Sequence, residues 1–150
     1  MYKKILVALE NSTADRSLLP HIVQLATLCH SRLLLLHVAD GWAARNFEQL
    51  NLAESEEMKQ DTSYLQEVAT RLRAENNIEV DVRLALGSPP KQIVQIAEEE
   101  GCSLIAMTSH GHRLLGDLFL GSTIDKVRHG SRIPILVVRA EGGTGPLPKV

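Results

Sequence analysis

The segment 108–123 combines glycines, hydroxyl side chains and histidines in a pattern that could hold a charged ligand. Gly111 and Gly121 permit sharp turns or a close approach of the backbone to another molecule. Ser122 and Thr123 follow Gly121 directly and open a predicted helix over 122–129. The first amide N–H groups of a helix are unpaired and carry partial positive charge, so they bind anions such as phosphate. The pattern indicates a phosphate site, although an ordinary glycine loop with a Ser/Thr helix cap looks the same.

Three basic side chains beside Gly111 could contact the same anion. His110 and His112 flank the glycine, and Arg113 follows them. Two histidines at this spacing could also bind a metal ion, but no cysteine or third histidine stands nearby at metal-site spacing. We therefore interpret both histidines first as loop residues, next as phosphate contacts and last as metal ligands. His37, inside a predicted strand, is interpreted as a hydrogen-bonded core histidine.

Composition limits the classes of partner. The chain has 150 residues, of which 44% are hydrophobic and only 3% aromatic, so one domain with an aliphatic core is expected. Its 18 acidic and 16 basic residues give a net charge of −2, which argues against binding to a nucleic-acid backbone. Cys29 and Cys102 form no CxxC pair and are expected to be buried free thiols in a reducing compartment. Because neither a secretory signal nor a membrane-length apolar run is visible, we expect a cytoplasmic protein.

Strand and helix patterns alternate along the chain and indicate an α/β fold with a parallel sheet covered on both faces. Short apolar runs predict buried strands over 4–9, 33–38, 103–107 and 133–138, and alternation over 78–84 predicts an edge strand. Helical spacing predicts helices over 18–29, 53–75, 89–101 and 122–129. We expect one domain over 1–140, a mobile loop over 40–51 that includes Trp42, and a flexible tail over 141–150. In such sheets ligands bind beyond the carboxyl ends of the strands.

The spacing of the glycine segment resembles the nucleotide signature of the universal stress protein family. That signature reads Gly, two residues, Gly, nine residues, Gly, then Ser or Thr, and Gly111 and Gly121-Ser122 match its last three positions. Residues 3–7, 35–38, 87–89 and 133–138 are similar to other conserved stretches of that family, so the resemblance runs from Met1 to about Arg139. It implies a three-layer α/β/α domain with a five-stranded parallel sheet, Rossmann-like and of the adenine nucleotide alpha hydrolase type. It also implies a role in stress resistance and a homodimer paired through the last strand.

Carried over position by position, the resemblance predicts where an adenine nucleotide would lie. Glu10 stands where the family usually has an Asp that contacts the adenine side, and Val38 matches a position that lines the adenine pocket. Ala8 and Leu9 stand where many members have Pro and Thr, and are expected to form pocket wall. Thr108 replaces the first glycine of the signature; it either obstructs the ligand or is an ordinary strand residue. The nucleotide-binding residues predicted are Ala8, Leu9, Glu10, Val38, Thr108, His110, Gly111, His112, Gly121, Ser122 and Thr123.

Three functions are compatible with these observations. The first is a stress-response regulatory protein that binds ATP or a related adenine nucleotide, with Mg²⁺ carried on the phosphates. The second is a nucleotide-free dimeric interaction protein of the same fold, which the departures at Glu10 and Thr108 favour. The third is a slow ATP hydrolase. No G-x-S-x-G elbow, Walker lysine or paired carboxylate motif is present, so no catalytic residue and no protein-held metal are predicted.

Overall fold

The computed structural model describes residues 1–39, 56–109 and 117–141, and all structural statements concern these residues. Its strands are β1 (Lys4–Ala8), β2 (Arg32–Ala39), β3 (Val80–Leu86), β4 (Leu104–Ser109) and β5 (Ile135–Arg139). Its helices are α1 (Asp15–Cys29), α4 (Glu56–Asn76), α5 (Pro89–Glu99) and α6 (Asp117–Gly130). The mobile loop predicted over 40–51 and all but the first residue of the predicted tail lie outside the described residues.

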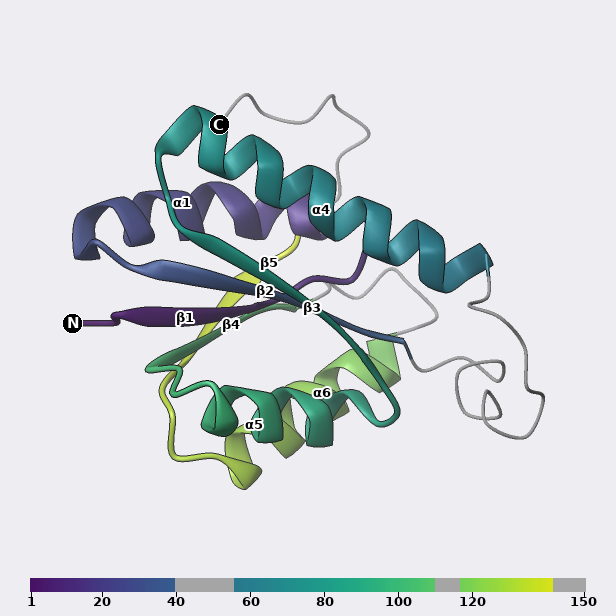
Figure 1. Cartoon of the computed structure of the whole chain (residues 1–150). Helices are drawn as coiled ribbons and strands as arrows, with labels where there is room; N and C mark the ends of the chain where they lie inside the picture. Colours follow the sequence, from purple (N-terminus) through teal and green to yellow (C-terminus); the bar gives the residue numbers. More distant parts are fainter. Residues whose placement is uncertain (40–55, 110–116, 142–150) are drawn as a thin grey trace.

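The five strands form one parallel sheet in the order β3-β2-β1-β4-β5. Helices α1 and α4 cover one face of this sheet, and α5 and α6 cover the other (Figure 1). The three-layer α/β fold predicted from the sequence is thereby confirmed. From β1 the chain continues to β2 and β3 on one side, whereas β4 and β5 lie on the other. The order therefore reverses between β1 and β4, where a crevice is expected at the carboxyl ends of the strands.

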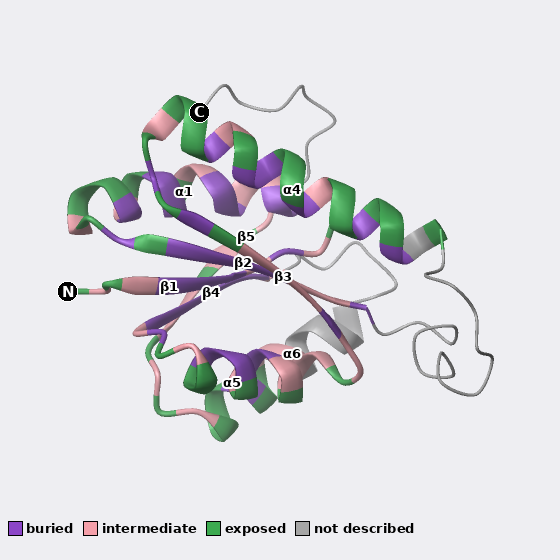
Figure 2. Ribbon diagram, viewed as in Figure 1, coloured by how far each residue is buried: buried purple, intermediate pink, exposed green. Residues whose placement is uncertain are grey.

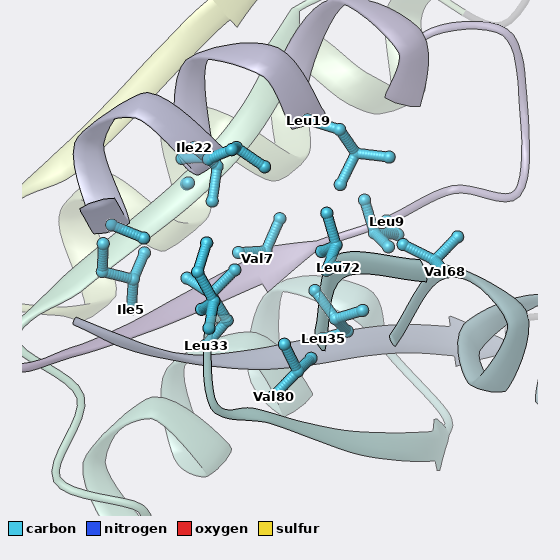
Figure 3. Packing of buried hydrophobic residues seen from close by; sticks show 14 of the residues in the cluster. Ile5, Val7, Leu9, Leu19, Ile22, Leu33, Leu35, Val68, Leu72 and Val80 are labelled. Carbon is cyan, nitrogen blue, oxygen red and sulfur yellow. The ribbon is translucent and has the colours of Figure 1, made fainter. Parts of the chain in front are cut away.

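Aliphatic side chains on the two faces of the sheet form two separate cores. On the face toward α1 and α4, Ile5, Val7, Leu33 and Leu35 are fully buried, and Figure 3 shows them packed against the helices. Neighbouring strand residues such as Leu6 point to the opposite core beneath α5 and α6. Burial on both faces is the reason why these strands read as continuous apolar runs (Figure 2).

The structure corrects three predictions. Helix α6 begins at Asp117, not near Ser122, because an acid suits the first turn of a helix and one internal glycine costs only about 1 kcal/mol. Cys102 is buried as expected, but Cys29 is only partly buried, since it lies in the last turn of α1. The strand predicted over 78–84 begins later, at Val80, and it does lie at a sheet edge. None of the helices described has the length and apolar character needed to cross a membrane.

Candidate functional site

A pocket of about 420 Å³ opens at the carboxyl edge of the sheet, where the strand order reverses. The ends of β1, β2 and β4 form its floor, while α5 and α6 supply its walls. Its lining residues are Ala8, Leu9, Glu10, Leu36, His37, Val38, Ser88, Pro89, Pro90, Ile93, Met107, Thr108, Thr123 and Lys126. Most of them are apolar, and a few hydroxyl and charged groups stand among them, as in pockets that bind small organic ligands.

Six of the predicted site residues line this one pocket. Ala8, Leu9 and Glu10 follow one another at the end of β1, and Val38 lies near the end of β2. Thr108 on β4 and Thr123 on α6 line it from the other side. Residues scattered over more than a hundred positions of the sequence are thus brought to one crevice. His110, Gly111 and His112 lie outside the described residues.

The course of α6 changes the position expected for Gly121 and Ser122. Because the helix begins at Asp117, these two residues stand in its second turn. In an α-helix the N–H of such a position is used by the carbonyl four residues earlier, and only the first four amides stay unpaired. The prediction that the amides of residues 121–123 start the helix is therefore wrong for this structure. The unpaired amides of α6 belong to its first turn, which begins at Asp117.

Thr108 is an ordinary strand residue whose hydroxyl has no partner among the described residues. It pairs with Val138 in the regular register of β4 and β5, and only 2% of the residue is exposed. Its Oγ1 atom is buried and makes no hydrogen bond with the part of the chain that the structure describes. Since a buried hydroxyl without a partner costs free energy, a polar group of a ligand would find a ready contact there. Of the two interpretations of Thr108, regular strand structure is the one observed.

The segment after β1 is held in place by the carboxylate of Asp15. Asp15 is buried in the first turn of α1 and accepts hydrogen bonds from the backbone N–H of Glu10 at 3.0 Å and of Asn11 at 2.9 Å. The Tyr64 hydroxyl of α4 donates a third at 2.7 Å. Burial raises the pKa of Asp15, and these hydrogen bonds oppose the shift. Burial and the nearby Asp15 charge raise the pKa of Tyr64, which stays a neutral donor.

A second contact with α4 runs through His37. Its Nδ1 lies 2.8 Å from the Leu9 carbonyl oxygen, and its Nε2 lies 3.2 Å from Oδ2 of Asp61 on α4. Oδ1 of Asp61 in turn accepts a hydrogen bond from the Asn11 side-chain amide at 2.9 Å. The hydrogen bonding predicted for His37 is confirmed, but the residue is only partly buried and lines the pocket, so it is not a core histidine. Two side chains of α4, Asp61 and Tyr64, therefore brace the short segment that forms one wall of the pocket.

The sequence analysis missed several residues of the site. Lys126 lines the pocket three positions after Thr123, a spacing that places both on the same face of α6. Asp61 precedes Leu65 by four positions and so extends the apolar stripe of α4, which marks it as an inward-facing acid. For Asp15 the only indication in the sequence is its place as an acid in the first turn of a helix. Within the described residues, no cluster of three or more His, Cys, Asp or Glu side chains is arranged to hold a metal ion.

A larger hollow of about 920 Å³ lies at the opposite, amino edge of the sheet. Its walls include Lys3, Lys4 and Arg32, but Lys4 is paired with Glu100 and Arg32 with Glu79. None of the predicted site residues that the structure describes is among its lining residues. Because parallel sheets bind ligands at their carboxyl edge, the smaller pocket is the better candidate despite its size.

Comparison with known proteins agrees with the fold and with the resemblance seen in the sequence. Residues 1–139 match the model of the Universal stress protein family. Universal stress protein MJ0577 of Methanocaldococcus jannaschii is 32% identical, with 93% of this chain and 96% of that protein covered. A solved structure of MJ0577 superposes with a TM-score of 0.73 over 95% of this chain and 99% of its own.

Two more distant structures were solved with nucleotides. A universal stress protein in complex with cAMP has a TM-score of 0.68 at 18% identity, with 93% of this chain and 98% of that chain covered. The universal stress protein from Archaeoglobus fulgidus in complex with dAMP has a TM-score of 0.67 at 18% identity, covering 91% of this chain and 98% of its own. At these identities the two structures support the fold alone. The match of the family model over 139 residues and the likeness to MJ0577 show that this chain belongs to the universal stress protein family.

Proposed function

We propose that the protein binds ATP or a related adenine nucleotide in the pocket at the carboxyl edge of the sheet. The observation that carries this proposal is the convergence of six predicted residues, from three strands and α6, on one pocket of suitable volume. Two family structures that hold cAMP and dAMP support it. The pocket also lies at the reversal of strand order, where nucleotides bind in other parallel α/β sheets.

The lining suggests an orientation for the nucleotide. Apolar groups of Ala8, Val38 and Met107 offer a surface for the base, and the Glu10 carboxylate stands at the same wall to accept a hydrogen bond. Thr123 and the cationic Lys126 lie across the pocket on α6, and we place the phosphates toward them. Any Mg²⁺ would be carried by the phosphates themselves.

A regulatory role fits the lining better than rapid hydrolysis. Glu10, His37 and Lys126 are the only ionisable residues that line the pocket among those described, and the His37 imidazole contacts Asp61 of α4. No described nucleophile and base form a catalytic pair there, so we expect hydrolysis to be slow at most.

A nucleotide-free interaction protein is the second candidate. The early start of α6 favours it, because that start removes the amides of residues 121–123 from the phosphate site.

Nucleotide binding is tested with purified protein and ATP with Mg²⁺. Binding at about 100 times Kd adds about 2.7 kcal/mol to the free energy of unfolding, which raises Tm by roughly 5–10 °C for a chain of this size. GTP is the control ligand for base selectivity. An unchanged Tm at about millimolar ATP, together with no nucleotide released from the protein after denaturation, would support the nucleotide-free alternative.

Replacing Thr108 by valine is expected to have opposite effects on the stability of the free protein and on nucleotide affinity. The valine keeps the shape but removes a buried hydroxyl without a partner, so we expect the free protein to gain about 1 kcal/mol of stability. If a nucleotide bonds to this hydroxyl, ATP affinity falls by roughly fivefold to tenfold, as measured by calorimetry. Thr108→Ser keeps the hydroxyl and is the control. Unchanged affinity in the valine variant would show that the ligand makes no use of Oγ1.

The exposed edge of β5 is the surface that we propose for a homodimer. This strand ends the sheet, and Val137 at its centre is 41% exposed although it is apolar. A lysine at position 137 would bury a charge in that interface, and we expect it to weaken the dimer by about a hundredfold. Leu28→Lys is the matched control, because Leu28 is an exposed apolar residue on α1. Sedimentation of the Val137→Lys variant as an unaltered dimer would place the interface elsewhere.

A further inference from the structure

The contact between His37 and Asp61 brings two hydrogen-bond acceptors together unless one of the two side chains carries an additional proton. The Leu9 carbonyl oxygen can only accept a hydrogen bond, so Nδ1 of His37, 2.8 Å away, must carry a hydrogen. In a neutral imidazole the other nitrogen, Nε2, then presents a lone pair. That lone pair would face Oδ2 of Asp61 at 3.2 Å, which is also an acceptor when the carboxylate is ionised.

One additional proton resolves this conflict. It can reside on His37, which gives an imidazolium paired with a carboxylate, or on Asp61, which then donates to Nε2. Only 6% of the Asp61 residue is exposed, so little water is available to separate two facing lone pairs. The approach of these two acceptor atoms therefore calls for one added proton between them. Histidine is the side chain whose unperturbed charge change lies between about pH 5 and 8.

The pair acts directly on the pocket wall. His37 holds Leu9, and Asp61 holds Asn11, on either side of Glu10. Without the proton, the repulsion between Nε2 and Oδ2 weakens the hold of α4 on this segment. We propose that the proton shared by His37 and Asp61 positions the Leu9–Asn11 segment for the nucleotide, so that ATP affinity decreases as pH rises. The proposal rests on the nucleotide-binding function proposed above, and it makes His37 and Asp61 positioning residues.

Other ionisable groups near the pair do not supply the same effect. On the segment itself Glu10 is a pocket-wall acid, and on α6 Lys126 lies across the pocket. The Tyr64 hydroxyl donates to Asp15, and burial raises the pKa of both groups.

On β3 the residue beside His37 is the apolar Leu84. Its neighbour Arg83 is engaged with Glu99 and Glu100, at the end of α5 and just beyond it.

Asp61→Asn is a matched variant that removes the need for the proton. The asparagine amide can donate to the lone pair of a neutral His37, while its oxygen still accepts from Asn11. Size and both hydrogen bonds are kept, but no extra proton is required. We therefore expect this variant to bind ATP about as tightly as the wild type at low pH and to keep that affinity at high pH.

The test is a comparison of ATP affinity at about pH 6 and about pH 8.5, by calorimetry, in wild type and Asp61→Asn. ATP titrates identically with both proteins, so the ratio between them isolates the protein's proton. We expect the wild type to lose roughly fivefold to tenfold more affinity than the variant over this range. Linkage requires this sign, because the state that binds ATP more tightly also holds the proton. The exposed His21→Asn variant is the control and should keep the wild-type pH dependence.

Two outcomes overturn the proposal while leaving the nucleotide function intact. One is an ATP affinity in the wild type that changes with pH no more than in Asp61→Asn. The other is an NMR titration of the ligand-free protein in which the His37 imidazole and Asp61 carboxyl hold no shared proton at about pH 6. Absence of ATP binding at both pH values in both proteins would instead reject the nucleotide function itself, and with it the coupling to pH.

Discussion

Replacing Ala8 by phenylalanine should abolish adenine nucleotide binding and leave the protein folded. Ala8 ends β1, lines the pocket and is only partly buried, on the face of the sheet that packs toward α5 and α6. Because Ala8 lines the pocket, we expect a phenyl ring at this position to occupy pocket volume and to displace ligand. Since the pocket holds only about 420 Å³, we expect ATP affinity to fall by more than about a hundredfold. Calorimetry measures the loss, and circular dichroism checks the fold.

A control separates occlusion of the pocket from a general effect of an added aromatic residue. Ala74 is exposed on α4, away from the pocket, and Ala74→Phe should bind ATP as the wild type does. A small Tm change, within about 2 °C, is expected for both variants because neither ring enters a packed core. If Ala8→Phe bound ATP within about threefold of wild type, the nucleotide would have to lie outside this pocket.

The strands of this protein were predictable because burial on both faces leaves a plain signal. β1 was expected over 4–9 and occurs at Lys4–Ala8, and β2 was expected over 33–38 and occurs at Arg32–Ala39. Each is a nearly continuous aliphatic run, which is typical of a strand that is covered on both faces of a parallel sheet. Alternation over 78–84 likewise identified an edge strand, since one face of β3 stays partly open. The pocket followed from the topology, because parallel strands bring their carboxyl ends to one edge.

The start of α6 was not predictable by the same reasoning. Gly121 followed by Ser122 and Thr123 looks like a loop and a cap, yet a helix that begins at Asp117 passes through all three. The cost of one glycine is small compared with the gain from extending the helix over the preceding leucines and phenylalanine. Local signals of about 1 kcal/mol therefore cannot decide a boundary that depends on the rest of the helix.

Contacts between distant elements were also beyond single-sequence reasoning. Asp15 and Tyr64 are 49 positions apart, and nothing local indicates that the acid of one helix meets the phenol of another. Once the fold is known, the reason is visible: α1 and α4 lie side by side on the same face of the sheet (Figure 1). Glu10 differs from the Asp that is usual in the family, and the sequence alone does not predict how it is positioned. The long-range contacts of Asp15 hold it in the pocket wall.

Asp15→Ala should therefore cause the largest loss of stability among the variants considered. The substitution removes a carboxylate that accepts three hydrogen bonds, from the backbone N–H groups of Glu10 and Asn11 and from the Tyr64 hydroxyl. Leaving buried donors unsatisfied costs about 1–3 kcal/mol each, reduced where water can reach the segment. We expect a loss of about 3 kcal/mol in the free energy of unfolding, or a Tm lower by roughly 10 °C. Urea denaturation and calorimetry measure both quantities.

The matched control and a ligand readout show whether this carboxylate serves the pocket as well as the fold. Asp81→Ala removes an exposed acid on β3 and should change stability by less than about 0.5 kcal/mol. At a temperature where Asp15→Ala is still folded, its ATP affinity should also fall by about tenfold, because Glu10 is no longer held against the pocket. A variant as stable as Asp81→Ala would mean that the three donors find other partners. Normal ATP affinity despite lost stability would mean that the wall at Glu10 does not contribute to nucleotide binding.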